Sequence, residues 1–84
     1  MDKETFKEKL DATHRWPCDF TFKFIMRPAQ LVRFKRLFPE DRWRKRESAQ
    51  GSYVCVTMER EVADADGVVE VYDRAAEIPG VMLL

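Results

Sequence analysis

Apolar and polar residues alternate along residues 19–26, and the apolar positions are rich in aromatic side chains. Period-two alternation over this length is typical of a strand with one buried face. The side chains expected to face the core are Phe20, Phe22 and Phe24. Those expected on the opposite face are Thr21, Lys23 and Ile25.

The N-terminal stretch, residues 1–15, is predicted to form a short helical arm. Phe6 and Leu10 lie one turn apart among lysines and glutamates, so a helix beginning near Asp2 would carry one narrow apolar stripe. An irregular segment is expected at residues 13–17, because Pro17 disfavours helix at the residue before it. Trp16 is then expected to anchor the arm to the core.

Two further helices are predicted from start and stop signals. One begins at Pro28, which suits a first helical turn, and ends at Pro39. The other begins after Asp64, a good N-cap, and ends before Pro79. Its inward side chains are expected to be Ala65, Val68, Val69, Tyr72, Ala75 and Ala76. Its outward side chains are expected to be Asp66, Glu70, Asp73 and Glu77.

Between these helices, residues 42–48 and 53–59 are predicted to form a hairpin. Gly51 supplies the positive φ that its tight turn needs. The heavy charge of the first strand favours an edge position, where lysine and arginine prevent unwanted pairing. Residues 81–84 are predicted to form a last strand that is apolar on both faces.

The order strand, helix, hairpin, helix, strand predicts one α+β domain over residues 1–84. It is expected to be a ferredoxin-like β-α-β-β-α-β two-layer sandwich with an antiparallel sheet of order 4-1-3-2. Both helices would cover one face of that sheet. The open face would carry Thr21, Lys23, Ile25, Tyr53, Cys55 and Thr57.

Net charge is zero, but basic residues gather in residues 33–46 and acidic residues follow from Glu59. Such a chain could steer an anionic partner to one side, or its two halves could attract each other or a second copy. No apolar stretch is long enough to cross a bilayer, and no secretory signal is visible, so a cytoplasmic location is expected. Cys18 and Cys55 are expected about 20 Å apart, as free thiols.

Catalytic and metal-binding patterns are not found in the sequence. His14 is the single histidine, and with Cys18 it offers two ligands where zinc needs three or four. No phosphate-binding loop or dinucleotide motif is present, and the serines have no neighbouring base. We therefore expect no enzyme activity, no metal and no cofactor.

RNA-recognition domains share this strand order, so nucleic acid is a candidate partner. Residues 50–56 are loosely similar to their third-strand motif, but the leading basic residue and all but one aromatic residue are missing. The open face is expected to carry little positive charge, and one tyrosine makes no stacking platform. The sequence argues against nucleic acid as the partner.

Several segments resemble the YbeD-like family of small uncharacterised bacterial proteins. The resemblance covers Trp16-Pro17, residues 20–26, residues 46–57, residues 68–72 and residues 78–81. It implies a ferredoxin-type sandwich similar to ACT regulatory domains and no established activity. Many members have serine, lysine and asparagine where this chain has Ala49, Gln50 and Ser52, which puts an anion-binding role of that lysine in doubt here.

The hairpin that carries this resemblance supplies the candidate contact residues for a ligand or partner. They are Glu47, Ser48, Gly51, Ser52 and Tyr53. The alternative is that these residues only build the turn. Two functions are expected: a non-enzymatic regulatory or interaction module that self-associates or binds a protein partner, or a sensor of an amino acid or small anion near Gly51.

Overall fold

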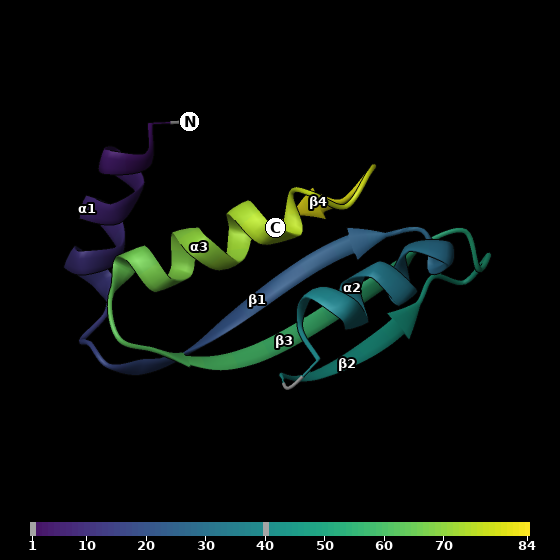
Figure 1. Cartoon of the computed structure of the whole chain (residues 1–84), viewed down its shortest axis with the longest axis horizontal. Helices are drawn as coiled ribbons and strands as arrows, with labels where there is room; N and C mark the ends of the chain where they lie inside the picture. The colour runs from purple at the N-terminus through teal and green to yellow at the C-terminus, as the bar shows by residue number, and fades with distance from the viewer. Residues whose placement is uncertain (1, 40) are drawn as a thin grey trace.

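The computed structural model describes residues 2–39 and 41–84, which form three α-helices and a four-stranded antiparallel sheet (Figure 1). The elements are α1 (Lys3–Thr13), β1 (Cys18–Met26), a 3-10 turn (Pro28–Gln30), α2 (Leu31–Leu37), β2 (Arg42–Glu47), β3 (Val54–Val62), α3 (Ala65–Ala75) and β4 (Met82–Leu83). The strands lie in the order β2-β3-β1-β4. The predicted α+β class is confirmed.

The two long strands β1 and β3 form the centre of the sheet. Their register pairs Cys18 with Val62 at one end and Met26 with Val54 at the other. The prediction that the second hairpin strand ends at Glu59 is therefore wrong. The strand continues to Val62 because β1 offers it a pairing partner as far as Cys18.

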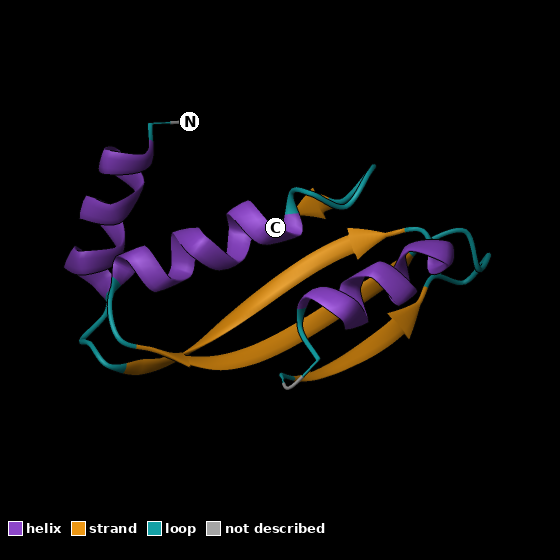
Figure 2. Cartoon of the chain, viewed as in Figure 1, coloured by secondary structure: helices purple, strands orange, loops and turns teal. Residues whose placement is uncertain are grey.

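The core lies between this sheet and the helices α2 and α3, which cover the same face (Figure 2). Alternation along β1 and β3 points every second side chain toward it, and six of these are fully buried: Phe22, Phe24, Met26, Val54, Val56 and Met58. Phe34 of α2 packs on Phe24, with ring centroids 5.6 Å apart. Each fully buried side chain of this size contributes roughly 1.5–3 kcal/mol.

Helix α3 begins as predicted, because the Asp64 side chain accepts a hydrogen bond of 2.9 Å from the backbone N–H of Gly67. The predicted set of inward side chains lacks one buried residue and includes one exposed residue. Val71 is fully buried, since α3 has the sheet, α1 and α2 as neighbours and buries a wider sector. Ala76 is exposed because the helix ends at Ala75.

Helix α1 packs beside α3 and continues through Thr13, the first residue of the segment predicted to be irregular. Asp2 caps it by accepting from the N–H of Glu4 at 3.1 Å. Leu10 is buried against the core, and the indole of Trp16, which is partly buried, donates to Asp11 at 2.8 Å. The Trp16–Pro17 peptide bond is cis.

Strand β4 is shorter than the predicted strand at residues 81–84. Val81 belongs to the preceding turn, where its N–H donates to the carbonyl of Ile78 at 3.3 Å. Met82 pairs with Ile25 and Leu83 pairs with Phe24, and the N–H of Leu84 donates to the carbonyl of Lys23 at 3.0 Å. No helix in the described ranges is long and apolar enough to span a membrane.

Candidate functional site

The predicted contact residues lie together in the β2–β3 hairpin, at one end of the sheet. The N–H of Ser48 donates to the carbonyl of Tyr53 at 2.9 Å, and the N–H of Gly51 donates to the carbonyl of Ser48 at the same distance. Gly51 has φ +70°, which confirms the predicted left-handed turn residue. The hydroxyl of Ser48 accepts from the N–H of Tyr53 at 3.3 Å. Gly51 and Ser48 thus account for the turn itself.

The remaining hairpin residues are exposed and make few contacts. Ser52 forms no side-chain hydrogen bond with any described residue, and Glu47 forms no ion pair within residues 2–39 and 41–84. Arg27, which sequence reasoning missed, lies over the ring of Tyr53 with 5.3 Å between guanidinium carbon and ring centroid. The hairpin is a well-formed turn with an exposed tip.

The open face of the sheet is more basic than the sequence suggested. The expected residues lie on it, but the β2–β3 register adds Arg42, Arg44 and Arg46 opposite Glu59, Thr57 and Cys55. All three arginines are exposed. The prediction of little positive charge on this face is wrong, because Trp43 turns inward toward Phe34 and alternation then turns the arginines outward.

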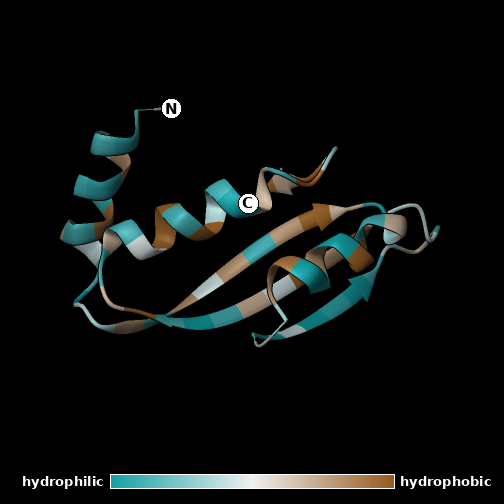
Figure 3. Ribbon diagram, viewed as in Figure 1, coloured by the Kyte–Doolittle hydropathy of each residue, from teal (hydrophilic) through white to brown (hydrophobic). Residues whose placement is uncertain are grey.

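An apolar hollow of about 330 Å³ lies between α1, α3 and the C-terminal strand. It is lined by Lys3, Phe6, Val69, Tyr72, Asp73, Ala76, Leu83 and Leu84. Met82, Leu83 and Leu84 are among the few large apolar side chains that are strongly exposed. Figure 3 shows this C-terminal segment as hydrophobic, whereas β2 is largely hydrophilic.

The polar groups of the hollow are Tyr72 and an ion pair at its rim. Burial raises the pKa of the Tyr72 phenol, whose hydroxyl donates to the carbonyl of Leu84 at 3.4 Å. Lys3 Nζ lies 2.9 Å from Asp73 Oδ2, and both side chains are more than half exposed. A second α1–α3 pair joins Lys7 to Asp66, and this hydrogen bond raises the pKa of Lys7.

The edge of β1 next to this hollow is only partly covered. β4 pairs with Phe24 and Ile25, and Leu84 extends the pairing to Lys23. Since outward-facing backbone groups alternate along a strand, those of Thr21 and Asp19 face the same edge as those of Lys23. Within the described residues, no strand pairs with this stretch on that side. It is an open sheet edge beside an apolar hollow.

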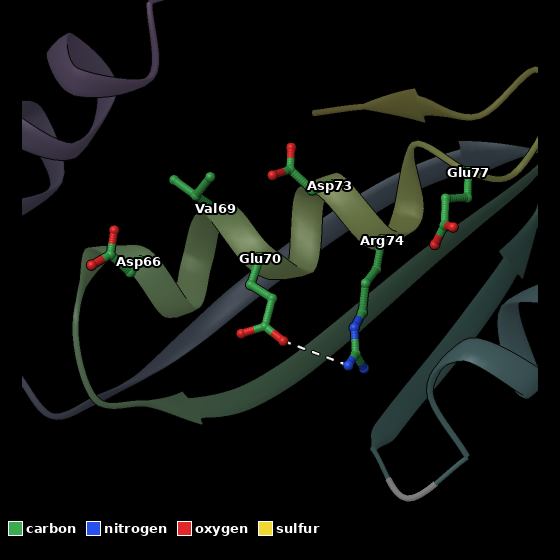
Figure 4. Close-up of a pocket in the computed structure, with 6 residues that line it drawn as sticks. All are labelled: Asp66, Val69, Glu70, Asp73, Arg74 and Glu77. Carbon is green, nitrogen blue, oxygen red and sulfur yellow. Dashed lines mark ion pairs between the residues drawn. The ribbon is translucent and has the colours of Figure 1, made fainter.

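The outer surface of α3 forms a shallow and mostly acidic depression (Figure 4). Its lining residues are Asp66, Val69, Glu70, Asp73, Arg74 and Glu77. Arg74 lies 3.5 Å from Glu70, one turn away on the same helix. Five of these side chains come from α3 and Glu77 comes from the turn that follows it. Apart from the Glu70–Arg74 pair they point outward in Figure 4, so they do not converge on a bound group.

The two cysteines lie at opposite ends of the central strand pair, and the single histidine packs among aromatic rings. Cys18 and Cys55 are free, and the register places Cys55 beside Ile25, seven positions along β1 from Cys18. The ring of His14 packs between those of Trp16 and Phe20, at 5.6 and 5.2 Å. Among the described residues, no group of three or more His, Cys, Asp or Glu side chains could hold a metal ion.

Comparison with known proteins gives no relative for this chain. No protein-family model, no curated protein and no solved structure matches it.

Proposed function

We propose that this protein is a non-enzymatic interaction module that self-associates through the open edge of β1. The observation that carries the proposal is the coincidence of unpaired β1 backbone groups with the apolar hollow and the exposed C-terminal leucines. Open sheet edges are templates for another strand, and exposed apolar patches mark interfaces. Together they offer main-chain hydrogen bonds and an apolar contact at one place.

A second copy is the occupant that this edge fits. A two-fold axis beside Phe20 would pair Asp19 with Thr21 of the second copy, and the reverse, so the outward backbone groups of both copies would be satisfied. The chain has no net charge, so two copies have no overall repulsion. At the other edge of the sheet, self-pairing would bring the arginines of β2 together.

Sedimentation equilibrium of the whole chain over a range of concentrations tests this proposal. The decisive variant is Thr21→Pro, because proline removes the backbone N–H of Thr21. That N–H faces the open edge and is not needed for pairing with β3. Thr21→Val is the matched control, since it keeps the N–H and suits a strand. We expect wild type and Thr21→Val to dimerise and Thr21→Pro to remain a folded monomer.

A second pair of variants tests the apolar contact in the same experiment. Leu83→Asp should weaken dimerisation about tenfold or more, whereas Val32→Asp should leave it unchanged. Val32 is the stricter control because its exposed fraction is 59%, against 43% for Leu83. A wild-type protein that is monomeric at every concentration would overturn the proposal. Equal weakening of dimerisation by Leu83→Asp and Val32→Asp would also overturn the proposal.

The strand order and the placement of the helices support a regulatory role for this self-association. The strand order β2-β3-β1-β4 and the two helices on one face fit the ferredoxin-like plan. We propose that the domain is ACT-like, and that its self-association serves regulation of a partner protein.

A second candidate function is recognition of a free apolar amino acid in the hollow. The volume of about 330 Å³ lies at the lower end of the range for ligand sites. Its apolar lining would take the side chain, while Lys3 and Asp73 at the rim have the charges that match the carboxylate and ammonium groups. A thermal-shift screen of leucine, phenylalanine and their amides separates the two functions, because a ligand of the native state raises Tm. No shift with any of them would refute the sensor.

A further inference from the structure

The outer edge of β2 is a second open edge of the sheet, on the opposite side from β4 (Figure 1). The Ser48–Tyr53 hydrogen bond fixes which residues bond to β3: by alternation these are Arg42, Arg44 and Arg46. The backbone groups of Trp43, Lys45 and Glu47 therefore face away from the sheet. No described segment pairs with them.

Three arginines beside this edge are evenly spaced, and the register places Glu59 of β3 opposite the first of them. Arg42, Arg44 and Arg46 project from the open face at alternate positions, roughly 7 Å apart along the strand. None of them forms an ion pair with a described residue, whereas Arg60, on the inner side, is held by Asp41 at 2.6 Å. Arg44 and Arg46, whose partners in register are the uncharged Thr57 and Cys55, are thus available to an outside anion.

We propose that the β2 edge binds an extended acidic segment of another protein by strand addition. A strand with aspartate or glutamate at every second position repeats its carboxylates at the same spacing of roughly 7 Å. Its backbone pairs with Trp43, Lys45 and Glu47, while its carboxylates lie opposite the arginines. Main-chain bonds supply affinity and the alternating charge supplies specificity.

Two other occupants fit this edge less well. A second copy would place arginine against arginine across the new pair. A single-stranded nucleic acid would find the charge but few aromatic surfaces on which bases stack, because Trp43 packs inward on Phe34 with ring centroids 5.3 Å apart. An acidic peptide uses both the charge and the free backbone groups.

The first test is titration of the whole protein with six-residue peptides, the length of β2. One peptide alternates glutamate and valine, and a second has the same composition with the glutamates in one block. We expect the alternating peptide to bind at least about tenfold more tightly, because only its carboxylates match the arginine spacing. Equal binding of both peptides, or tighter binding of a single-stranded oligonucleotide that displaces them, would overturn the proposal.

Matched protein variants locate the site. The double variant Arg44→Ala/Arg46→Ala should weaken binding of the alternating peptide about tenfold. Arg33→Ala/Arg36→Ala removes the same charge from α2 and should change binding less than about twofold. Equal losses in the two double variants would show a diffuse charge effect and refute strand addition.

A backbone variant separates strand addition from charge attraction. Lys45→Pro removes one outward N–H, and Lys45→Ala removes the same charge but keeps that N–H. We expect the proline variant to bind the alternating peptide at least about fivefold more weakly than the alanine variant. Should Lys45→Pro fail to fold, an alternating peptide methylated at its backbone nitrogens serves the same purpose, and undiminished binding of it would overturn the proposal.

Discussion

The two outer edges of the sheet differ in length, charge and surroundings. At one edge β4 contributes two residues and leaves the first half of β1 uncovered beside an apolar hollow. At the other edge β2 contributes six residues, five of them exposed, and four of those are basic. Each edge has free backbone groups, so their different side chains decide what each can pair with.

This difference follows from how the two edges are anchored to the core. β2 is held on the core by Trp43 alone among its residues, so its other positions are free to be charged. The C-terminal segment has apolar residues throughout, but the hollow leaves Leu83 and Leu84 partly exposed. Charge therefore protects the β2 edge against its own copy, whereas the β1 edge has no such protection.

The largest expected effect comes from placing proline at neighbouring positions of β2. Arg44→Pro removes an N–H that bonds to β3 and should lower the free energy of unfolding by about 3 kcal/mol. Lys45→Pro removes an outward N–H and should cost about 1 kcal/mol or less. Urea unfolding measures both values, and equal losses would show that the inferred register of free and bonded groups is wrong.

The next largest effect is expected from α1, which should contribute to self-association at the β1 edge but not to peptide binding at the β2 edge. Phe6 packs on Tyr72 with ring centroids 6.0 Å apart and lines the hollow, so Phe6→Ala should cost about 2 kcal/mol and reduce self-association. Peptide binding at β2 should be unchanged, because α1 lies on the far side of α3. Glu8→Ala, on the exposed side of α1, is the control. Equal losses of both binding activities in Phe6→Ala would contradict the separation.

Much of this fold could be predicted from periodicity. The aromatic alternation in β1, the Asp64 cap and the Gly51 turn each act through neighbours in the sequence, and each is found as predicted. The end of β3 at Val62 could not be predicted in this way, since it depends on pairing with Cys18, more than forty residues away. The same holds for β4, whose pairing covers two residues of an entirely apolar segment.

The candidate surfaces were harder to predict than the fold. The resemblance predicts the hairpin residues as contacts, whereas the structure explains Gly51 and Ser48 by the turn itself. The hollow joins Phe6, Tyr72 and Leu83 from three separate elements, so no local pattern signals it. The alternation of residues 42–47 shows that the arginines share one side of the strand. Which side of the sheet they face depends on Trp43, which packs inward.

A smaller effect is expected from salt, which should act on one edge only. Raising the salt concentration from about 50 mM to about 500 mM should weaken binding of the acidic peptide about tenfold, because the arginines of β2 are exposed to solvent. Dimerisation through the hollow should change less than about twofold, since apolar burial is not screened. Equal salt dependence of the two equilibria would contradict the assignment of one apolar and one charged edge.

The smallest expected effect is a pH dependence that belongs to the hollow. Burial raises the pKa of Tyr72 above its ordinary value of 10.0, so the folded state keeps the phenol proton to higher pH than the unfolded state does. The contribution to stability is complete below about pH 10 and is lost as pH rises through the folded pKa. Urea unfolding should therefore show that the free energy of unfolding falls between about pH 9 and about pH 11. We expect this fall to be smaller in Tyr72→Phe than in wild type, by less than about 1 kcal/mol. The same fall in both proteins would mean that other groups cause it and that the hollow does not bury this phenol.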